Sequence, residues 1–202
     1  MEVKRKGSLL SFRPDIKVLD ATLRDGGLCN NFEFTDDFAR ALYRMNVAAG
    51  VDYMEMGYKA SKAMFDPSKF GKYKFCDEED IRKIVGDNDT DMKLAVMADV
   101  GRTDFKKDIG PKKDSAVDMV RVACYINEIP RAIEMIEYCA AMGYETCANV
   151  MAVSKAKDEE IADALDMLGQ SPVDVIYLVD SYGSLYPEQV AELALIYLEA
   201  GE

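Results

Sequence analysis

The stretch VLDATLRDGG, residues 18–27, places a β-rich apolar run directly before a charged pair and two glycines. Residues 17–23 have the length and composition of a buried strand. The segment after them has neither the glycine pattern of a dinucleotide-binding turn nor the lysine-containing pattern of a phosphate loop. We therefore expect Arg24 and Asp25 to stand at the carboxyl end of a strand that serves another kind of chemistry.

Five further apolar runs follow, and stretches with helical periodicity lie between them. The runs are residues 52–56, 92–98, 118–124, 145–151 and 173–179. The periodicity predicts helices over residues 38–49, 78–85, 130–142, 161–168 and 187–200. Because strands and helices alternate about every 30 residues without hairpin signals, the sheet is expected to be parallel.

Two architectures suit six parallel strands, a doubly wound open sheet and an unfinished (β/α)₈ barrel. Polar residues recur in or just after the apolar runs, at Arg24, Asp25, Glu55, Asp99, Arg121, Asn149 and Asp180. Since all strands of a barrel end at one mouth, this pattern favours an α/β fold of the (β/α)₈ TIM-barrel class, with about six βα units present. The partial barrel is expected over residues 17–202 as the catalytic domain, with residues 1–16 as an N-terminal extension.

The composition restricts the chemistry of the chain. It has 37 acidic and 25 basic side chains, a formal net charge of −12 and no histidine. The negative balance argues against nucleic acid or an anionic membrane as a partner. Without histidine, the chain cannot by itself build a Ser–His–Asp or Cys–His catalytic system or a His-ligated zinc site.

The cysteines indicate a reducing compartment. The chain has five of them, an odd number, and none forms a C-x-x-C pair. This excludes a fully paired disulfide framework. With no signal-peptide pattern and no run of about 18 apolar residues, a cytoplasmic protein is expected.

A barrel mouth would gather the carboxylates of Asp25, Glu55 and Asp180 with the guanidiniums of Arg24 and Arg121. Oxygen ligands of this kind suit Mg²⁺ or Mn²⁺. A metal beside a guanidinium polarises a carbonyl and holds an enolate, the charge that develops in aldol and Claisen reactions. The alternative is that some of these charges pair with one another and only close the mouth.

Four segments resemble one family of enzymes. Residues 18–27 are similar to the first-strand signature of the metal-dependent lyase and Claisen-condensing barrels, which include 3-hydroxy-3-methylglutaryl-CoA lyase, 4-hydroxy-2-oxovalerate aldolase and isopropylmalate synthase. Residues 53–57, YMEMG, resemble the family's second strand. Residues 120–123 (VRVA) and 179–184 (VDSYGS) resemble the fourth and sixth strands. The resemblance runs over residues 18–201.

The resemblance implies roles for three residues. Asp25 would be a ligand of a divalent metal, Arg24 would stabilise the enolate oxygen, and Glu55 would orient Arg24 and the surroundings of the metal. It also implies a small oxoacid such as pyruvate as the substrate. The candidate substrate-binding residues are Asn31, Arg121, Asn149 and Asp180, although Asn31 could equally form a turn.

The sequence departs from the family at its histidines. The family completes its metal site with an H-x-H motif on the seventh strand, whereas this sequence has no histidine and ends after the sixth helix. We therefore expect a truncation, with the other metal ligands beyond residue 202, and weak metal binding by these residues alone. Exchange of strands with a second copy is the alternative, so a homo-oligomer is left open.

The ketoacid aldolases also place a catalytic histidine just after the first-strand motif, where this chain has residues 28–32, LCNNF. The usual acid/base is therefore missing. Cys29, Tyr58, Lys59 and Tyr182 are candidate proton carriers, against a packing or surface role for each. Residues 61–75, which interleave aromatic residues with lysines, are expected to form a loop that covers the mouth.

Three functions remain in view. The leading hypothesis is a divalent-metal-dependent aldolase or lyase that acts on a small 2-oxoacid through an enolate. A Claisen-type acyl-CoA-dependent acyltransferase, similar to isopropylmalate synthase, is the second. The third is a non-catalytic barrel subunit, which the missing histidines support.

Overall fold

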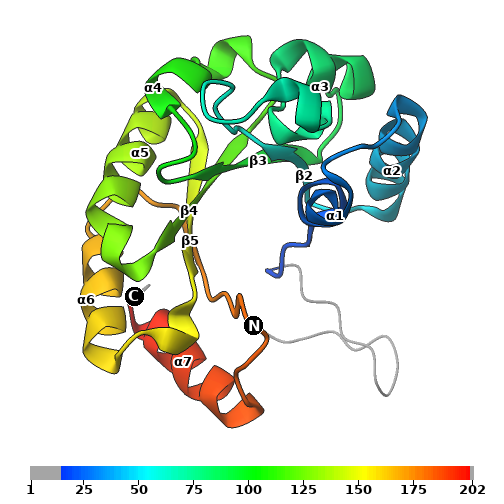
Figure 1. Ribbon diagram of the computed structural model, residues 1–202. Coiled ribbons are helices and arrows are strands. Elements are labelled where there is room, and N and C mark those ends of the chain that lie inside the picture. Colours follow the sequence, from blue (N-terminus) through cyan, green and yellow to red (C-terminus); the bar gives the residue numbers. More distant parts are fainter. Residues whose placement is uncertain (1–14, 201–202) are drawn as a thin grey trace, which may run out of the picture.

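The computed structural model describes residues 15–200, which form one curled sheet of six parallel strands with helices on its convex side (Figure 1). The strands lie side by side in chain order and are β1 (Leu19–Asp20), β2 (Tyr53–Tyr58), β3 (Lys93–Asp99), β4 (Met119–Tyr125), β5 (Glu145–Met151) and β6 (Val175–Tyr177). A doubly wound sheet reverses its strand order, so the sequential order and the curl confirm the predicted partial barrel. The expected N-terminal extension lies almost entirely outside residues 15–200.

Within residues 15–200, seven α-helices connect and cover the strands. They are α1 (Thr22–Asn30), α2 (Asp36–Ala49), α3 (Glu78–Val85), α4 (Phe105–Asp108), α5 (Ile129–Ala141), α6 (Asp158–Gly169) and α7 (Pro187–Glu199), with short 3₁₀ turns in the loops. Local signals explain the ends of α2, because the Thr35 hydroxyl accepts a bond from the Phe38 amide and Gly50 closes the helix at φ 72°. Within residues 15–200, no helix combines the length and the apolar character needed to cross a membrane.

The prediction for the first strand was wrong beyond Asp20. β1 covers only two residues, and α1 begins at Thr22, so Arg24, Asp25 and both glycines lie in a helix rather than in a turn. The Asp20 carboxylate accepts hydrogen bonds from the Thr22 amide and hydroxyl, at 3.2 and 2.7 Å, where the chain passes from β1 into α1. Tertiary packing therefore overrides the β-rich composition of this segment.

The other strand and helix predictions were close. Residues 145–151 and 78–85 were predicted with the bounds of β5 and α3. β2 runs two residues further than predicted, to Tyr58, whereas β6 keeps only the middle of its predicted range.

The sheet has two different faces. The main core packs the convex side of the sheet against the helices. The concave side holds a small cluster built only from strand residues, with Ala95, Met119 and Cys147 buried at its centre. Glu55 pairs in register with Ala95, and Arg121 with Cys147, so both charged side chains point to this concave face.

Hydrogen bonds tie three strands together at the amino-terminal end of the concave face. The Tyr53 hydroxyl donates to Glu145 Oε1 at 2.8 Å, and Lys93 Nζ donates to Glu145 Oε2 at 2.6 Å. Charged residues at this end of a barrel serve stability, because ligands bind at the opposite end.

Two glycines allow the loop after β2 to pack tightly. A Cβ on Gly57, at φ 152°, would lie 1.9 Å from the Tyr73 carbonyl oxygen, and a Cβ on Gly71 would lie 1.9 Å from that of Phe32. The loop is therefore fixed to β2 on one side and to the end of α1 on the other.

We expect Gly57→Ala to destabilise the protein by more than about 3 kcal/mol, because the new methyl group meets backbone rather than a side chain that can move. Urea unfolding followed by circular dichroism would measure the loss. Gly110→Ala is the matched control, since a Cβ there meets no atom within 4 Å. Equal stability of the two variants would contradict the close packing.

Candidate active site

Glu55 lies at the centre of the candidate site. It is on β2, its side chain has 0% exposure, and its Oε2 atom accepts a hydrogen bond from Arg24 Nε at 2.7 Å and forms an ion pair with Arg121 Nη1 at 2.6 Å. Among the residues described, Oε1 has no hydrogen-bond partner. One carboxylate oxygen thus joins a guanidinium from α1 to a guanidinium from β4.

Arg24 reaches this carboxylate from the first turn of α1. Its Nη1 atom also donates to Asp25 Oδ1 at 2.8 Å, while the Asp25 side chain is 68% exposed. Burial of the guanidinium lowers the pKa of Arg24, but the charge and hydrogen bond of Glu55 outweigh this and the pKa is raised overall. Arg24 is therefore a fixed cation, and the Asp25 carboxylate beside it is exposed to solvent.

Arg121 extends the site towards β5 and β6. Its Nη2 atom donates to Asn149 Oδ1 at 3.1 Å, and its guanidinium lies 4.5 Å from the centre of the Tyr177 ring. Asn149 Nδ2 is buried and has no hydrogen-bond partner within the described part of the chain. Arg24, Glu55, Arg121 and Asn149 thus form one connected group, as the sequence analysis anticipated for a shared mouth.

Asn31 and Asp180 lie outside this connected group, and each accepts a hydrogen bond from a backbone amide of a loop. Asn31 closes α1 in the left-handed conformation, at φ 53°, and its carbonyl oxygen accepts from the Gly71 amide at 2.8 Å. Asp180 Oδ2 accepts from the Leu185 amide at 3.0 Å, and backbone N–H groups of its loop lower the pKa of the carboxyl.

A second cluster of buried charges stands beside Arg24. Lys74 and Asp99 are each 7% exposed, and Tyr58 is 8% exposed. Burial and the charge of Asp99 raise the pKa of Tyr58, whereas Arg24 lowers it. In the sequence, Asp99 stands out only as a strand-end residue, and Lys74 is one of several lysines in the loop of residues 61–75. The signal available for Lys74 was the interleaving with aromatic residues, which does not indicate which lysine is buried.

Comparison with known proteins gives the family. The family model described as HMGL-like matches residues 15–197. This chain belongs to the HMGL-like family. It is similar to 4-hydroxy-2-oxovalerate aldolase 6 of Rhodococcus jostii (strain RHA1), with 27% identity over 86% of this chain and 48% of that protein. It is also similar to the 4-hydroxy-2-oxovalerate aldolase of Geobacillus genomosp. 3, with 25% identity over 88% of this chain and 52% of that protein.

A solved structure supports the fold of this HMGL-like chain. The crystal structure of the HMG-CoA lyase from Brucella melitensis matches with a TM-score of 0.65 and 15% identity, over 92% of this chain and 68% of that chain. The chain spans about half the length of the curated relatives it matches. Its fold is thus that of a partial TIM barrel with six parallel strands.

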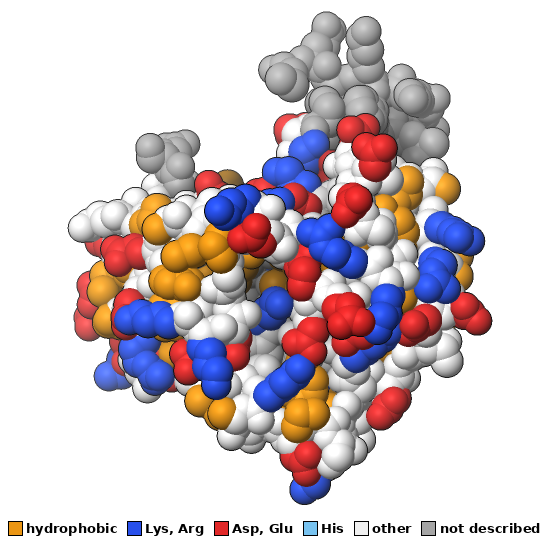
Figure 2. Space-filling model, turned by 90° about the horizontal axis from the view of Figure 1, so that it is seen from above, with side chains coloured by type: hydrophobic (Ala, Val, Ile, Leu, Met, Phe, Trp, Pro, Cys, Tyr) orange, Lys and Arg blue, Asp and Glu red, His pale blue; other side chains and the backbone are white. Residues whose placement is uncertain are grey.

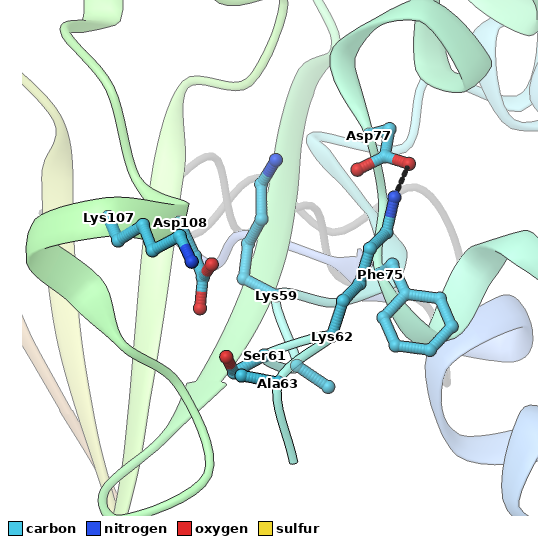
Figure 3. A pocket seen from close by; sticks show the side chains of 9 residues that line it. Lys59, Ser61, Lys62, Ala63, Phe75, Asp77, Lys107 and Asp108 are labelled. Carbon is cyan, nitrogen blue, oxygen red and sulfur yellow. Dashed lines mark hydrogen bonds and ion pairs between the residues drawn. The ribbon is translucent and has the colours of Figure 1, made fainter. Parts of the chain in front are cut away.

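The HMGL-like chain also carries a polar cavity in the loops after β2 and β3. It has a volume of about 330 Å³, and Figure 3 shows Lys59, Lys62 and Lys107 among its lining side chains. Lys62 forms an ion pair with Asp77, and Lys59 Nζ donates to the Cys76 carbonyl at 2.6 Å. The surface in Figure 2 mixes acidic and basic side chains and shows no continuous basic area on that face.

We expect Glu55→Gln to destabilise the HMGL-like chain by about 3–5 kcal/mol, because two buried guanidiniums would lose their shared anion. The matched control is Glu134→Gln, which breaks the exposed pair with Lys106 and should cost less than about 1 kcal/mol. Chemical denaturation of both variants gives the two free energies. A similar loss in both would show that the buried bridge is unimportant for stability.

Proposed function

We propose that this chain contributes the enolate-stabilising part of a carbon–carbon lyase, an aldolase that acts on a small 2-oxoacid such as pyruvate or its aldol. The observation that supports this most strongly is the buried Glu55 carboxylate between Arg24 and Arg121. Two guanidiniums held rigidly on the concave face of a barrel suit a substrate with two neighbouring oxyanions. A 2-oxoacid enolate carries such a pair, one on the carboxylate and one on the former ketone.

Each member of the group then has a separate task. Arg24 would donate to the enolate oxygen as charge develops, and Glu55 would hold the guanidinium so that no reorganisation is needed during the reaction. Arg121 and Asn149 would bind the substrate carboxylate, because Arg121 Nε and Asn149 Nδ2 are buried donors without a hydrogen-bond partner among residues 15–200. Asn31 and Asp180 would act indirectly, by shaping the loops at the mouth.

The proposal includes a divalent cation such as Mn²⁺ or Mg²⁺, for which residues 15–200 offer one candidate ligand. Asp25 offers one accessible carboxylate beside Arg24, which fits a single metal ligand. Within residues 15–200, no group of three or more Asp, Glu or Cys side chains is arranged to hold a metal ion. When bound, a divalent cation would polarise the carbonyl of the oxoacid.

Two other functions remain as alternatives. A Claisen-type acyltransferase would use the same enolate stabilisation with an acyl-CoA, and release of free thiol from acetyl-CoA in the presence of 2-oxoacids would identify it. A non-catalytic barrel subunit would bind no oxoacid. The aldolase is favoured because the curated relatives named above carry that activity in their names.

The proposed location is the cytoplasm. All five cysteines are free thiols, and four of them are buried. Burial raises the pKa of Cys76, Cys124, Cys139 and Cys147 to about 12. Protonated, buried thiols suit a reducing compartment, in which no disulfide is needed.

The full-length protein with Mn²⁺ should release pyruvate from a 4-hydroxy-2-oxoacid, in a lactate dehydrogenase-coupled assay. Arg24→Lys should reduce kcat by about 10²–10³-fold, because lysine cannot donate to Glu55 and to the enolate with the same fixed geometry. Arg131→Lys is the control, since the Arg131 side chain is 62% exposed and forms an ion pair with Glu128 on the surface. Absence of turnover with every 4-hydroxy-2-oxoacid tested would exclude the proposed reaction.

We expect Asp25→Asn to weaken Mn²⁺ binding by the full-length protein about tenfold or more, because the neutral amide is a poorer ligand for a hard cation. Isothermal titration calorimetry measures this without any need for turnover. Asp37→Asn, which changes a carboxylate that is 97% exposed at the start of α2, should leave the affinity unchanged. Equal affinities in all three proteins would show that Asp25 is not a ligand.

A further inference from the structure

The Lys74 side chain is enclosed by aromatic rings. It stands at the end of the 3₁₀ turn Lys72–Lys74, in the loop that follows β2, and is 7% exposed. Its Nζ atom lies over four ring centroids, at 4.5 Å from Tyr58, 4.6 Å from Phe65, 5.0 Å from Phe32 and 5.8 Å from Phe70. These four rings, which we call the aromatic cage, come from β2, from the end of α1 and from the loop itself.

The backbone holds this cage in place. The Lys74 amide donates to the Gly71 carbonyl at 3.1 Å, and the Lys74 carbonyl accepts from the Ala60 amide at 3.2 Å. Gly71 in turn donates to Asn31 and packs against the backbone of Phe32. The position of Lys74 is therefore set by the same contacts that fix the loop to α1 and β2.

The charges that face Lys74 come from β3 and the turn after it. Asp99 acts on Lys74 as an opposite charge, and Arg102 as a like charge. Asp99 Oδ1 is buried without a hydrogen-bond partner among residues 15–200, and Oδ2 lies 3.6 Å from Arg102 Nη1. Within the same residues, Lys74 Nζ neither donates a hydrogen bond nor forms an ion pair. The Lys74 ammonium and the half-paired Asp99 carboxylate thus act on each other as opposite charges.

The surroundings shift both groups towards their neutral forms. Burial lowers the pKa of the Lys74 ammonium, against the opposing charge of Asp99 and with the help of Arg102. Burial likewise raises the pKa of the Asp99 carboxyl, against Arg102, Lys74 and Arg24. The aromatic rings attract the cation, so the protonated form of Lys74 is also accommodated. A side chain whose neutral and protonated forms are both accommodated by its surroundings can take up a proton and release it again.

We propose that Lys74, placed opposite Asp99 in the aromatic cage, carries the proton of the carbon–carbon lyase reaction in a chain that has no histidine. This inference rests on the proposed function. Tyr58 connects the two parts of the site, because its ring centre lies 4.5 Å from Lys74 Nζ, and its pKa is raised by burial and by Asp99 but lowered by the charge of Arg24. Asp99 is the positioning residue that holds the ammonium once it has formed.

The proton step balances without any further reactant. The neutral Lys74 amine takes the proton from the hydroxyl group on the carbon whose bond will break. The electron pair of the carbon–carbon bond moves onto the 2-oxo group as an enolate beside Arg24, and the hydroxyl carbon becomes an aldehyde. The Lys74 ammonium then returns its proton to the enolate carbon, which yields the shorter 2-oxoacid and restores the amine.

Two substitutions separate proton transfer from charge. In the full-length protein with Mn²⁺, Lys74→Met removes both the proton carrier and the positive charge. Lys74→Arg keeps the positive charge but does not release its proton. Both should reduce kcat by about 10²–10⁴-fold, with little change in KM. Lys69→Met, on the same loop at an exposed position, should remain within about twofold of the unchanged protein. Activity of Lys74→Arg close to that of the unchanged protein would overturn the proposal.

A second measurement does not depend on turnover. Lysine ¹³Cε resonances followed by NMR against pH should show one lysine that titrates below the others, and its signal should be missing in Lys74→Met. An ordinary titration midpoint for Lys74 overturns the proposal even if an aldolase activity is found.

Exchange of the pyruvate methyl protons in D₂O adds a direct readout, since loss of exchange in Lys74→Met and Lys74→Arg, but not in Lys69→Met, supports Lys74 as the carrier. If the unchanged protein neither exchanges these protons nor cleaves any oxoacid, the proposed function fails instead.

Discussion

The constraint on which the rest of the site depends is the burial of one carboxylate between two guanidiniums. Desolvation of Glu55, Arg24 and Arg121 is costly for each charge taken alone, so the three can be buried only together. Their pairing joins α1, β2 and β4, which are separate in sequence but meet on the concave face. Apolar replacement of a whole buried ion pair often changes net stability little, although removal of one partner is costly, so the value of the pair here is that it fixes the direction of two donors.

The aromatic cage also removes a charged side chain, that of Lys74, from water. Lys74 is taken out of water by hydrocarbon and ring faces rather than by a paired anion, so its charge is not locked. Arg24 and Lys74 therefore differ in kind. Glu55 stabilises the charge of Arg24 and raises its pKa, whereas burial lowers the pKa of Lys74. A permanent cation suits a developing enolate, and a labile one suits proton transfer.

The sequence predicted the architecture well because strand and helix periods are local properties. Residues 78–85 and 145–151 form the elements that their patterns indicate, and polar residues in or just after the apolar runs suggested that Glu55, Arg121 and Asn149 lie close together. The helix that contains Arg24 was missed, since two glycines and a β-rich composition contradict it locally, and contacts with distant residues such as the Arg24–Glu55 hydrogen bond do not show in the sequence. Lys74 was missed for a related reason. Its burial results from four rings in three segments, and no spacing in the sequence shows that they converge.

The loop after β2 links these two parts of the site. Gly57 lets the loop cross β2 at a distance that no side chain would permit, and Gly71 lets it rest on Phe32, directly after the helix that carries Arg24 and Asp25. A shift of α1 would therefore move Phe32, and with it the cage around Lys74, because both depend on the same backbone contact. The positions of the enolate-stabilising guanidinium and of the proposed proton carrier are thus coupled by packing. Such coupling suits a reaction in which the proton must reach the carbon next to the stabilised enolate.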